Sequence, residues 1–192
     1  MKRILLMSIL SFGLISAACM ADDSNVAIKK EDAGNKNLAL KKEAKASDSY
    51  SAYVPSEAND GVVDFIKLWC CNPNKDIGAW WSVDLGESYK LTEVKIKYAS
   101  HMQGKFSFVP TIVSVQVSND NVKWTTVIDK FKNLPKTGEK YEDKFYSYPL
   151  PSDTNGQYVR LVFDDGAGAD DSRKMVGLVE VEVMGSLSLI HI

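Results

Sequence analysis

Short segments in which polar and apolar residues alternate constrain the fold of this chain most strongly. Residues 93–98 alternate glutamate and lysine with valine, isoleucine and tyrosine, and residues 113–118 alternate valines with serine and glutamine. Four further strand-like segments lie at residues 81–86, 124–128, 158–163 and 178–183, between Gly, Pro, Asn and Asp turn residues. Period-two alternation is typical of strands with one buried face. We therefore predict an all-β fold, an antiparallel jelly-roll β-sandwich of about eight strands.

Composition excludes several function classes. The chain has 192 residues, with 23 Lys+Arg against 25 Asp+Glu and a net charge of −2, so it lacks the basic excess that attracts nucleic acid. The 45% hydrophobic fraction is that of an ordinary globular protein, and the length predicts one main domain. Two histidines and no recognisable acid–base pair or phosphate-binding loop leave little for catalysis. We predict a protein that is not an enzyme.

The N-terminus resembles an export signal. A positively charged start precedes an apolar core at residues 4–15 and small residues at 16–18, and this core is too short to span a bilayer, which takes about 20 residues. Residues 1–21 are therefore predicted to be a signal peptide, and the mature protein secreted, periplasmic or on the cell surface. A lipid anchor on Cys19 is the alternative, although serine stands where a lipobox usually has leucine. Residues 22–34 are polar and predicted to be a linker.

The C-terminus ends in an unusual segment. Its last six residues, LSLIHI, resemble the in-frame translation of a sequencing adapter. We therefore expect residues 35–185 to form the domain and residues 186–192 to be a non-native tail. The intact gene would then continue, for example into a downstream catalytic domain. A genuine short hydrophobic tail is the alternative.

Six short motifs follow one another in a fixed order. They are NLAL with AKAS at residues 37–47, ANDG at 58–61, WSVDLG at 81–86, VQVSND with KWT at 115–125, GQYVRL at 156–161 and GLVEVEV at 177–183. Together they resemble the discoidin family, also called the coagulation factor V/VIII type C domain. In an exported protein the resemblance points to bacterial carbohydrate-binding modules of family 32. It implies a sandwich that binds galactose, N-acetylgalactosamine or related sugars in shallow loops at one end, often beside a glycoside hydrolase.

The resemblance also implies one structural calcium ion (Ca2+). Carried over by position, Asp60 and Glu180 are the carboxylate ligands, with backbone carbonyls near Val62 and Val179. Calcium favours such oxygen ligands. The chain departs from the family pattern at Val62, where asparagine is usual, and Asp64 could supply the oxygen that the family takes from threonine. The alternative is that Asp60 only closes a turn and that Glu180 is an outward strand residue.

Sugar recognition needs an aromatic face and polar groups around the sugar hydroxyls. The loops at residues 50–53, 64–79, 100–109 and 164–175 offer both. We expect the ligand-binding residues to be Trp69, Tyr53, Phe106, His101, Asn72 and Arg173. Three alternatives remain open: Trp69 is a buried plug, His101 is a solvated loop residue, and Arg173 forms a local ion pair.

The other tryptophans and the two adjacent cysteines also lead to predictions. We assign Trp80, Trp81 and Trp124 mainly to the core, although the adjacent Trp80 and Trp81 must point to opposite faces if both lie in a strand. In an oxidising compartment Cys70 and Cys71 could form a vicinal disulfide, pair between chains or stay reduced. Galactose-binding relatives often carry histidine at the position of Cys70. No Cys-x-x-Cys redox motif is present.

The sequence as a whole predicts a non-catalytic, extracytoplasmic carbohydrate-binding module. Its partners would be glycans of the galactose or N-acetylgalactosamine type, with no nucleic acid and no transmembrane segment. One alternative is an adhesion domain that binds protein or lipid head groups, for which exposed apolar side chains would be expected. Another is that the chain is the targeting arm of a truncated glycoside hydrolase.

Overall fold

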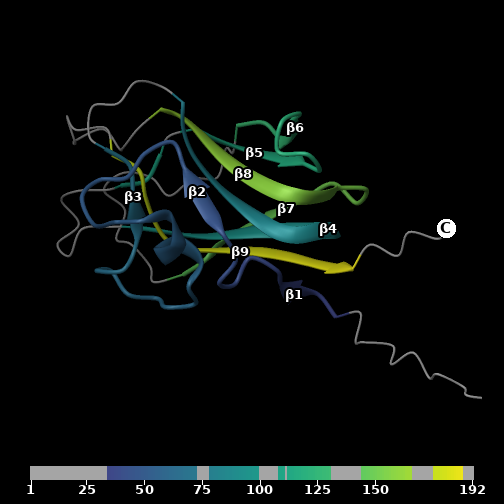
Figure 1. Cartoon of the computed structure of the whole chain (residues 1–192), viewed down its shortest axis with the longest axis horizontal. Helices are drawn as coiled ribbons and strands as arrows, with labels where there is room; N and C mark the ends of the chain where they lie inside the picture. The colour runs from purple at the N-terminus through teal and green to yellow at the C-terminus, as the bar shows by residue number, and fades with distance from the viewer. Residues whose placement is uncertain are drawn as a thin grey trace, which may run out of the picture. The chain divides into compact units, whose positions relative to one another are not determined.

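The computed structural model describes residues 34–72, 78–99, 108–110, 112–130, 144–165 and 175–187 (Figure 1). Within these residues the chain forms nine β-strands and one short 3-10 helix. The elements are β1 (Lys36–Asn37), β2 (Ala44–Ala46), η1 (Pro55–Asn59), β3 (Trp69–Cys70), β4 (Ala79–Tyr98), β5 (Ile112–Ser118), β6 (Thr125–Ile128), β7 (Tyr146–Pro149), β8 (Asn155–Asp165) and β9 (Gly177–Leu187). This confirms the predicted all-β fold. No helix in the described part of the chain is long and apolar enough to cross a membrane.

Strand β4 belongs to both layers of the sandwich. Its first part pairs with β2 and β8, and its last part pairs with β7 and β9. Pairing with β8 is interrupted between Asp84 and Tyr89, around Gly86, whose φ is +93°. Glycine adopts this backbone conformation readily, and irregular pairing lets a strand bend. The two predicted strands at residues 81–86 and 93–98 are therefore one strand of 20 residues.

All the strand pairs are antiparallel, and they form two layers joined through β4. The continuous order is β1-β9-β4-β8-β5-β6, with β2 and β7 paired to β4 and β3 paired to β9. We call the layer that contains β2, the first part of β4, β8, β5 and β6 the front layer. We call the layer that contains β7, the last part of β4, β9, β1 and β3 the back layer. The two names do not refer to the direction of view in the figures.

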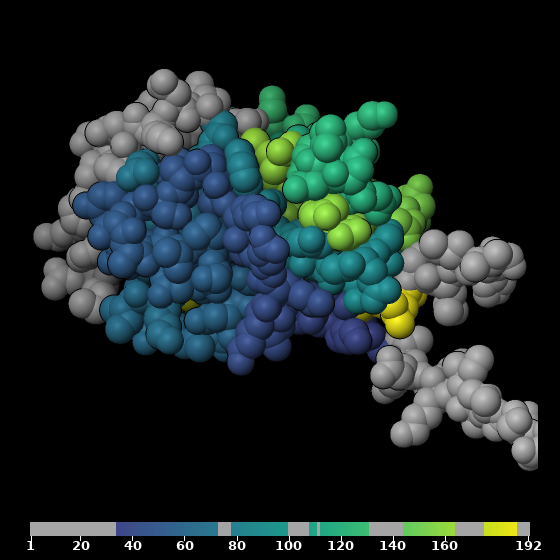
Figure 2. Space-filling view, viewed as in Figure 1, coloured from purple at the N-terminus to yellow at the C-terminus, as the bar shows by residue number. Residues whose placement is uncertain are grey.

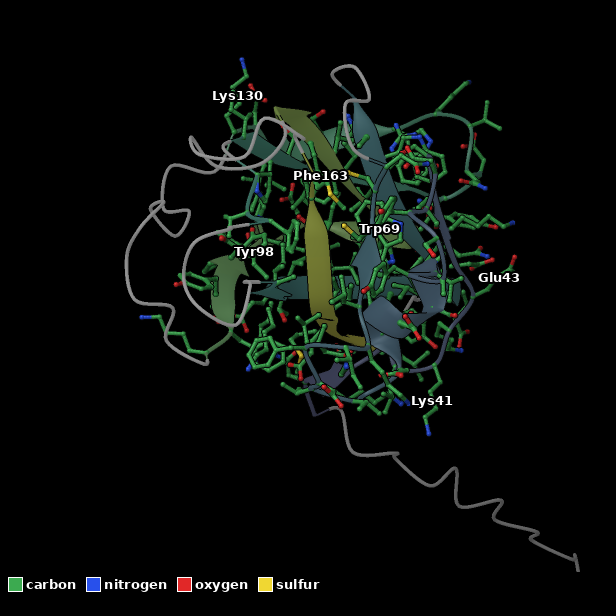
Figure 3. The ribbon with its side chains drawn as sticks, turned by 90° about the vertical axis from the view of Figure 1, so that its left-hand side faces the viewer. Lys41, Glu43, Trp69, Tyr98, Lys130 and Phe163 are labelled. Carbon is green, nitrogen blue, oxygen red and sulfur yellow. The ribbon has the colours of Figure 1, made fainter. Side chains whose placement is uncertain are left out.

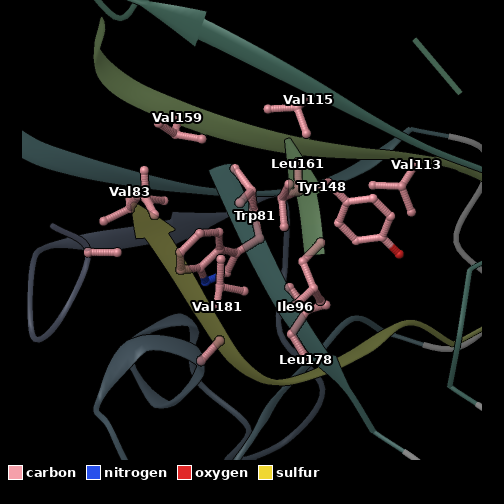
Figure 4. Close-up of a cluster of buried hydrophobic side chains, with 14 of the residues drawn as sticks. Trp81, Val83, Ile96, Val113, Val115, Tyr148, Val159, Leu161, Leu178 and Val181 are labelled. Carbon is pink, nitrogen blue, oxygen red and sulfur yellow. The ribbon is translucent and has the colours of Figure 1, made fainter. Parts of the chain in front are cut away.

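The main hydrophobic core fills the space between the two layers (Figure 4). The front layer contributes Trp81, Val83, Val113, Val115, Val159 and Leu161, and the back layer contributes Ile96, Tyr148, Leu178 and Val181. Fully burying an apolar side chain of this kind stabilises the fold by about 1.5–3 kcal/mol. The Trp81 indole nitrogen donates a hydrogen bond to the Pro55 carbonyl at 2.9 Å, which fixes η1 over the core.

Only one of the three tryptophans assigned to the core lies there. Trp81 is fully buried, as predicted. Trp80 and Trp124 are only half-buried and lie outside the core, so for these two the prediction is wrong. Trp80 points away from the core because neighbouring strand residues alternate in direction. Trp124 lies beside the Arg160 guanidinium instead.

A β-bulge interrupts the alternation in β9. Lys97 of β4 pairs with Glu180, but the next residue, Tyr98, pairs with Leu178, so Val179 is the extra residue. Leu178 and Val181 consequently both enter the main core, while Val179 packs into a second cluster. This cluster contains Leu68, Cys70, Ala99, Met175 and Val179, with Tyr53 and Phe108 against it. Bulges redirect side chains in this way, whereas Glu180 points away from the main core by ordinary alternation with Val181, which lies in it.

Candidate functional site

The loop between β2 and η1 is fixed onto β3 by three hydrogen bonds. The Trp69 indole nitrogen donates to the Asp48 carbonyl at 2.9 Å. The Asn72 amide donates to Asp48 Oδ1 at 2.6 Å, and the Tyr50 amide donates to the Cys70 carbonyl at 2.7 Å. Asp48 therefore connects the loop to Trp69, at the start of β3, and to Asn72, two residues beyond its end. This role of Asp48 could not be predicted from the sequence, because an aspartate in a loop is common.

Two tyrosines of this loop form a stacked pair. The ring centroids of Tyr50 and Tyr53 lie 6.4 Å apart, with an angle of 17° between the ring planes. Tyr53 is half-buried against the second hydrophobic cluster, whereas Tyr50 is 40% exposed. Tyr53, predicted as a binding residue, thus supports Tyr50, which the prediction did not single out within the same loop. A solvent-facing aromatic ring can stack on the apolar face of a sugar.

Trp69 does not present its ring to solvent. It is fully buried, and its ring centroid lies 5.9 Å from that of Phe163. Figure 3 shows Trp69 and Phe163 in the interior, while Lys41, Glu43 and Lys130 project outward. Trp69 is therefore not placed to stack on a sugar. It lies buried under the loop, which is the alternative stated for it above. Its one polar atom is satisfied by Asp48, so the indole is buried without an unpaired donor.

The other predicted sugar-binding residues have different outcomes. Asn72 is half-buried two residues after β3, and its backbone amide donates to Asp48 Oδ1. The predictions for His101, Phe106 and Arg173 fall outside the described residues, as does the lipid anchor at Cys19.

The adjacent cysteines enter different hydrophobic clusters. Cys70 packs into the second cluster and Cys71 into the main core, where the Val176 amide donates to Cys71 Sγ at 3.0 Å. Adjacent side chains in an extended strand point in opposite directions. A vicinal disulfide would require this arrangement to change.

Glu180 and Asp60 come together where residues 60–67 cross the outside of β9. Glu180 is 2% exposed, and its Oε2 accepts a hydrogen bond from the Gly61 amide at 3.3 Å. Its Oε1 is buried with no hydrogen-bond partner among the described residues. Burial is the main reason that the pKa of Glu180 is raised to about 8; the hydrogen bond from the Gly61 amide opposes the rise, and the nearby Asp60 and Glu182 charges add to it.

This arrangement of oxygens fits a bound calcium ion. A buried carboxylate oxygen without a partner is costly unless a cation compensates it, and calcium binds carboxylate and carbonyl oxygens. Asp60 also closes a turn, since its Oδ1 accepts from the Val62 amide at 2.7 Å. Asp64 does not join this pair: its Oδ1 accepts from the Ile66 amide at 3.1 Å, and no three His, Cys, Asp or Glu side chains form a metal-binding group within the described ranges.

The same segment displays several apolar side chains to solvent. Val62, Val63, Phe65 and Ile66 are 39, 49, 44 and 74% exposed. The segment is nevertheless held in place by its turn at Asp64 and by Lys97, whose Nζ lies 5.9 Å from the Phe65 ring centroid. This surface, residues 62–66, is named the apolar loop below.

Comparisons with known proteins agree with this architecture. The family model of the F5/8 type C domain matches residues 43–180. The chain therefore belongs to the F5/8 type C, or discoidin, family, which confirms the resemblance and the galactose-binding-like fold seen in the sequence. No curated protein sequence matches the chain.

Several solved structures are similar to the chain. Chitosan-binding module 1 of a chitosanase/glucanase from Paenibacillus sp. IK-5 is 26% identical with a TM-score of 0.60, over 78% of this chain and 98% of the module. The family 32 carbohydrate-binding module of NanJ from Clostridium perfringens, solved with galactose, is 14% identical with a TM-score of 0.60, over 79% and 99%. CpGH89CBM32-4, produced by C. perfringens and solved with GlcNAc-α-1,4-galactose, is 21% identical with a TM-score of 0.55, over 80% and 96%. The chain thus has the fold of carbohydrate-binding modules.

Proposed function

We propose that this domain is a non-catalytic, exported carbohydrate-binding module that recognises a terminal sugar through the loop carrying Tyr50. The observation that carries the proposal is the exposed Tyr50 ring, supported from below by Tyr53 and fixed to β3 through backbone hydrogen bonds. Galactose or N-acetylgalactosamine is the expected sugar. A glucosamine-type sugar is the alternative, because one similar module is described as chitosan-binding.

The geometry favours weak but specific binding of one sugar. The apolar face of a pyranose stacks on the Tyr50 ring, and the polar groups near Asp48 and Asn72 surround its hydroxyls. The loop is already ordered, which lowers the entropy cost of binding, but a single exposed ring buries little area. Tight attachment to a glycan-coated surface would therefore come from several copies binding together.

A glycan array with the mature chain tests the proposal. The array presents galactose, N-acetylgalactosamine and chitosan oligosaccharides to the wild type, to Tyr50→Ala and to the matched control Tyr50→Phe. We expect Tyr50→Ala to weaken binding at least tenfold, and Tyr50→Phe to stay within about threefold because it keeps the stacking ring. No binding to any of these sugars, or equal binding by Tyr50→Ala, would overturn the proposal.

We also propose that Asp60 and Glu180 hold a structural calcium ion, together with carbonyls near Val62 and Val179. The proposal rests on the buried, partnerless oxygen of Glu180 beside a second carboxylate. The ion would neutralise the buried carboxylate. Through it, residues 60–67 would be tied to β9.

The apolar loop supports a second candidate function, adhesion to a lipid surface. Exposed apolar residues grouped on one rigid loop are unusual for a soluble domain and mark contact surfaces. Sedimentation with phosphatidylserine/phosphatidylcholine vesicles tests it, with Ile66→Asp as the variant and Val122→Asp as the matched control on a distant exposed position. We expect vesicle binding to be lost only in Ile66→Asp. Absence of wild-type sedimentation would exclude this function.

A further inference from the structure

The outer surface of the front layer carries a row of polar residues that the sugar-binding loop does not use. Ser82 of β4, Arg160 of β8, Gln116 of β5 and Thr126 of β6 lie directly opposite one another across four strands. Directly paired residues share a face of the sheet. The space-filling view shows atoms of β8 at the surface beside those of β4 and of the β5–β6 region (Figure 2).

Arg160 is held in one orientation on this surface. Its Nε and Nη2 both donate to Gln116 Oε1, at 2.9 and 2.6 Å. Gln116 is fixed in turn, because its Nε2 donates to Thr126 Oγ1 at 3.2 Å. The Arg160 guanidinium carbon lies 4.0 Å from the centroid of the Trp124 ring. Stacking and hydrogen bonding thus orient the guanidinium before any ligand arrives.

The orientation of Arg160 leaves hydrogen-bond donors unused. A guanidinium has five N–H donors, and the Nε–Nη2 edge faces Gln116. Within the described residues, Nη1 has no acceptor and Arg160 forms no salt bridge with a carboxylate. The group is half-buried, and desolvation lowers the pKa of Arg160 with no acidic neighbour opposing it. A partly desolvated cation without a counter-charge favours an anion that can pair with it.

The surroundings indicate what kind of anion would fit. A carboxylate accepts two parallel hydrogen bonds from one edge of a guanidinium. Half-buried aromatic side chains, Trp124, Trp80 and Tyr158, lie on the same surface, and aromatic rings suit the apolar faces of sugars. A single oriented arginine in a chain of net charge −2 does not form the extended basic patch that polyanions such as nucleic acid require.

We propose that the outer surface of the front layer is a second carbohydrate site, at which Arg160 binds the carboxylate of an acidic sugar and Trp124 packs beside it. Gln116 is the positioning residue. The site is separate from the loop carrying Tyr50 and does not depend on sugar binding there, so an inactive loop leaves this proposal standing.

Calorimetric titration of the mature chain with trigalacturonate tests this proposal. Its methyl ester is the matched probe, because it keeps the sugar rings and removes the carboxylate charges. We expect the wild type to bind trigalacturonate at least tenfold more tightly than the ester. Arg160→Lys keeps the charge but loses the two-donor edge and should weaken binding at least tenfold. Lys45→Ala removes a neighbouring exposed cation of the same face and should change binding less than twofold.

A second variant keeps the test valid if Arg160→Lys folds poorly. Gln116→Glu places a carboxylate against Arg160, so the domain should stay folded while trigalacturonate binding is lost. Equal binding of the ester, equal losses in Lys45→Ala and Arg160→Lys, or full binding by Gln116→Glu would each overturn the proposal. Loss of binding in Tyr50→Ala would also overturn it, because the ligand would then occupy the loop.

Discussion

At the scale of single residues, the Glu180 side chain lies in an energetically unfavourable environment within the described structure. A carboxylate with almost no exposure and one partnerless oxygen contributes unfavourably to stability when ionised, and its raised pKa expresses that cost. Its persistence at a bulge beside Asp60 is understandable if a cation offsets the charge. Removing the charge and removing the cation should then have opposite effects on stability.

Glu180→Gln separates these two effects. In a chelator the variant should melt higher than the wild type, because no charge is buried. With excess calcium the order should reverse, because only the wild type gains stability from the ion. Thermal unfolding of both proteins under both conditions measures this, with Glu182→Gln, half-buried on the same strand face, as the control. If the wild-type melting temperature is the same with calcium and with chelator, the metal site is excluded.

At the scale of the elements, the bend in β4 makes the sandwich possible. One strand serves both layers only because its backbone changes direction around Gly86, where φ is +93°. An added Cβ there would meet its nearest atom, Lys42 Nζ, at 3.4 Å, so space does not require glycine. Glycine is required at position 86 because residues with a side chain rarely adopt a φ of +93°.

Gly86→Ala should therefore destabilise the domain by about 1–3 kcal/mol, the usual cost of a strained backbone residue. Ser88→Ala, at a half-buried position two residues further along β4, should change stability by less than about 0.5 kcal/mol. Urea unfolding of the two variants provides the comparison. Equal stability of both would mean that the bend tolerates a side chain and is set elsewhere.

At the scale of the whole molecule, the sequence was sufficient for the fold but not for the site. The alternation of polar and apolar residues and the six ordered motifs predict the main strands, because each strand can be recognised from residues that are close together in the sequence. The continuity of β4 depends on one glycine conformation, and the directions of Leu178 and Val179 depend on a bulge that shifts the register by one residue. Which aromatic residue is exposed, Tyr50 rather than Trp69, follows from packing against Phe163 and Asp48, which lie far away in the sequence.

The arrangement of the terminal strands has a mechanical consequence. Lys36 of β1 pairs with Gly185 near the end of β9, so the domain's first and last strands meet at one end, while β3 lies at the other (Figure 1). A pulling force applied to the chain before β1 and after β9 would load these antiparallel hydrogen bonds one after another rather than all at once. The short β1 would detach first, and β9 would then peel from β4. The domain would yield to tension gradually, and the Tyr50 loop, at the end away from the load, would be the last part to lose its shape.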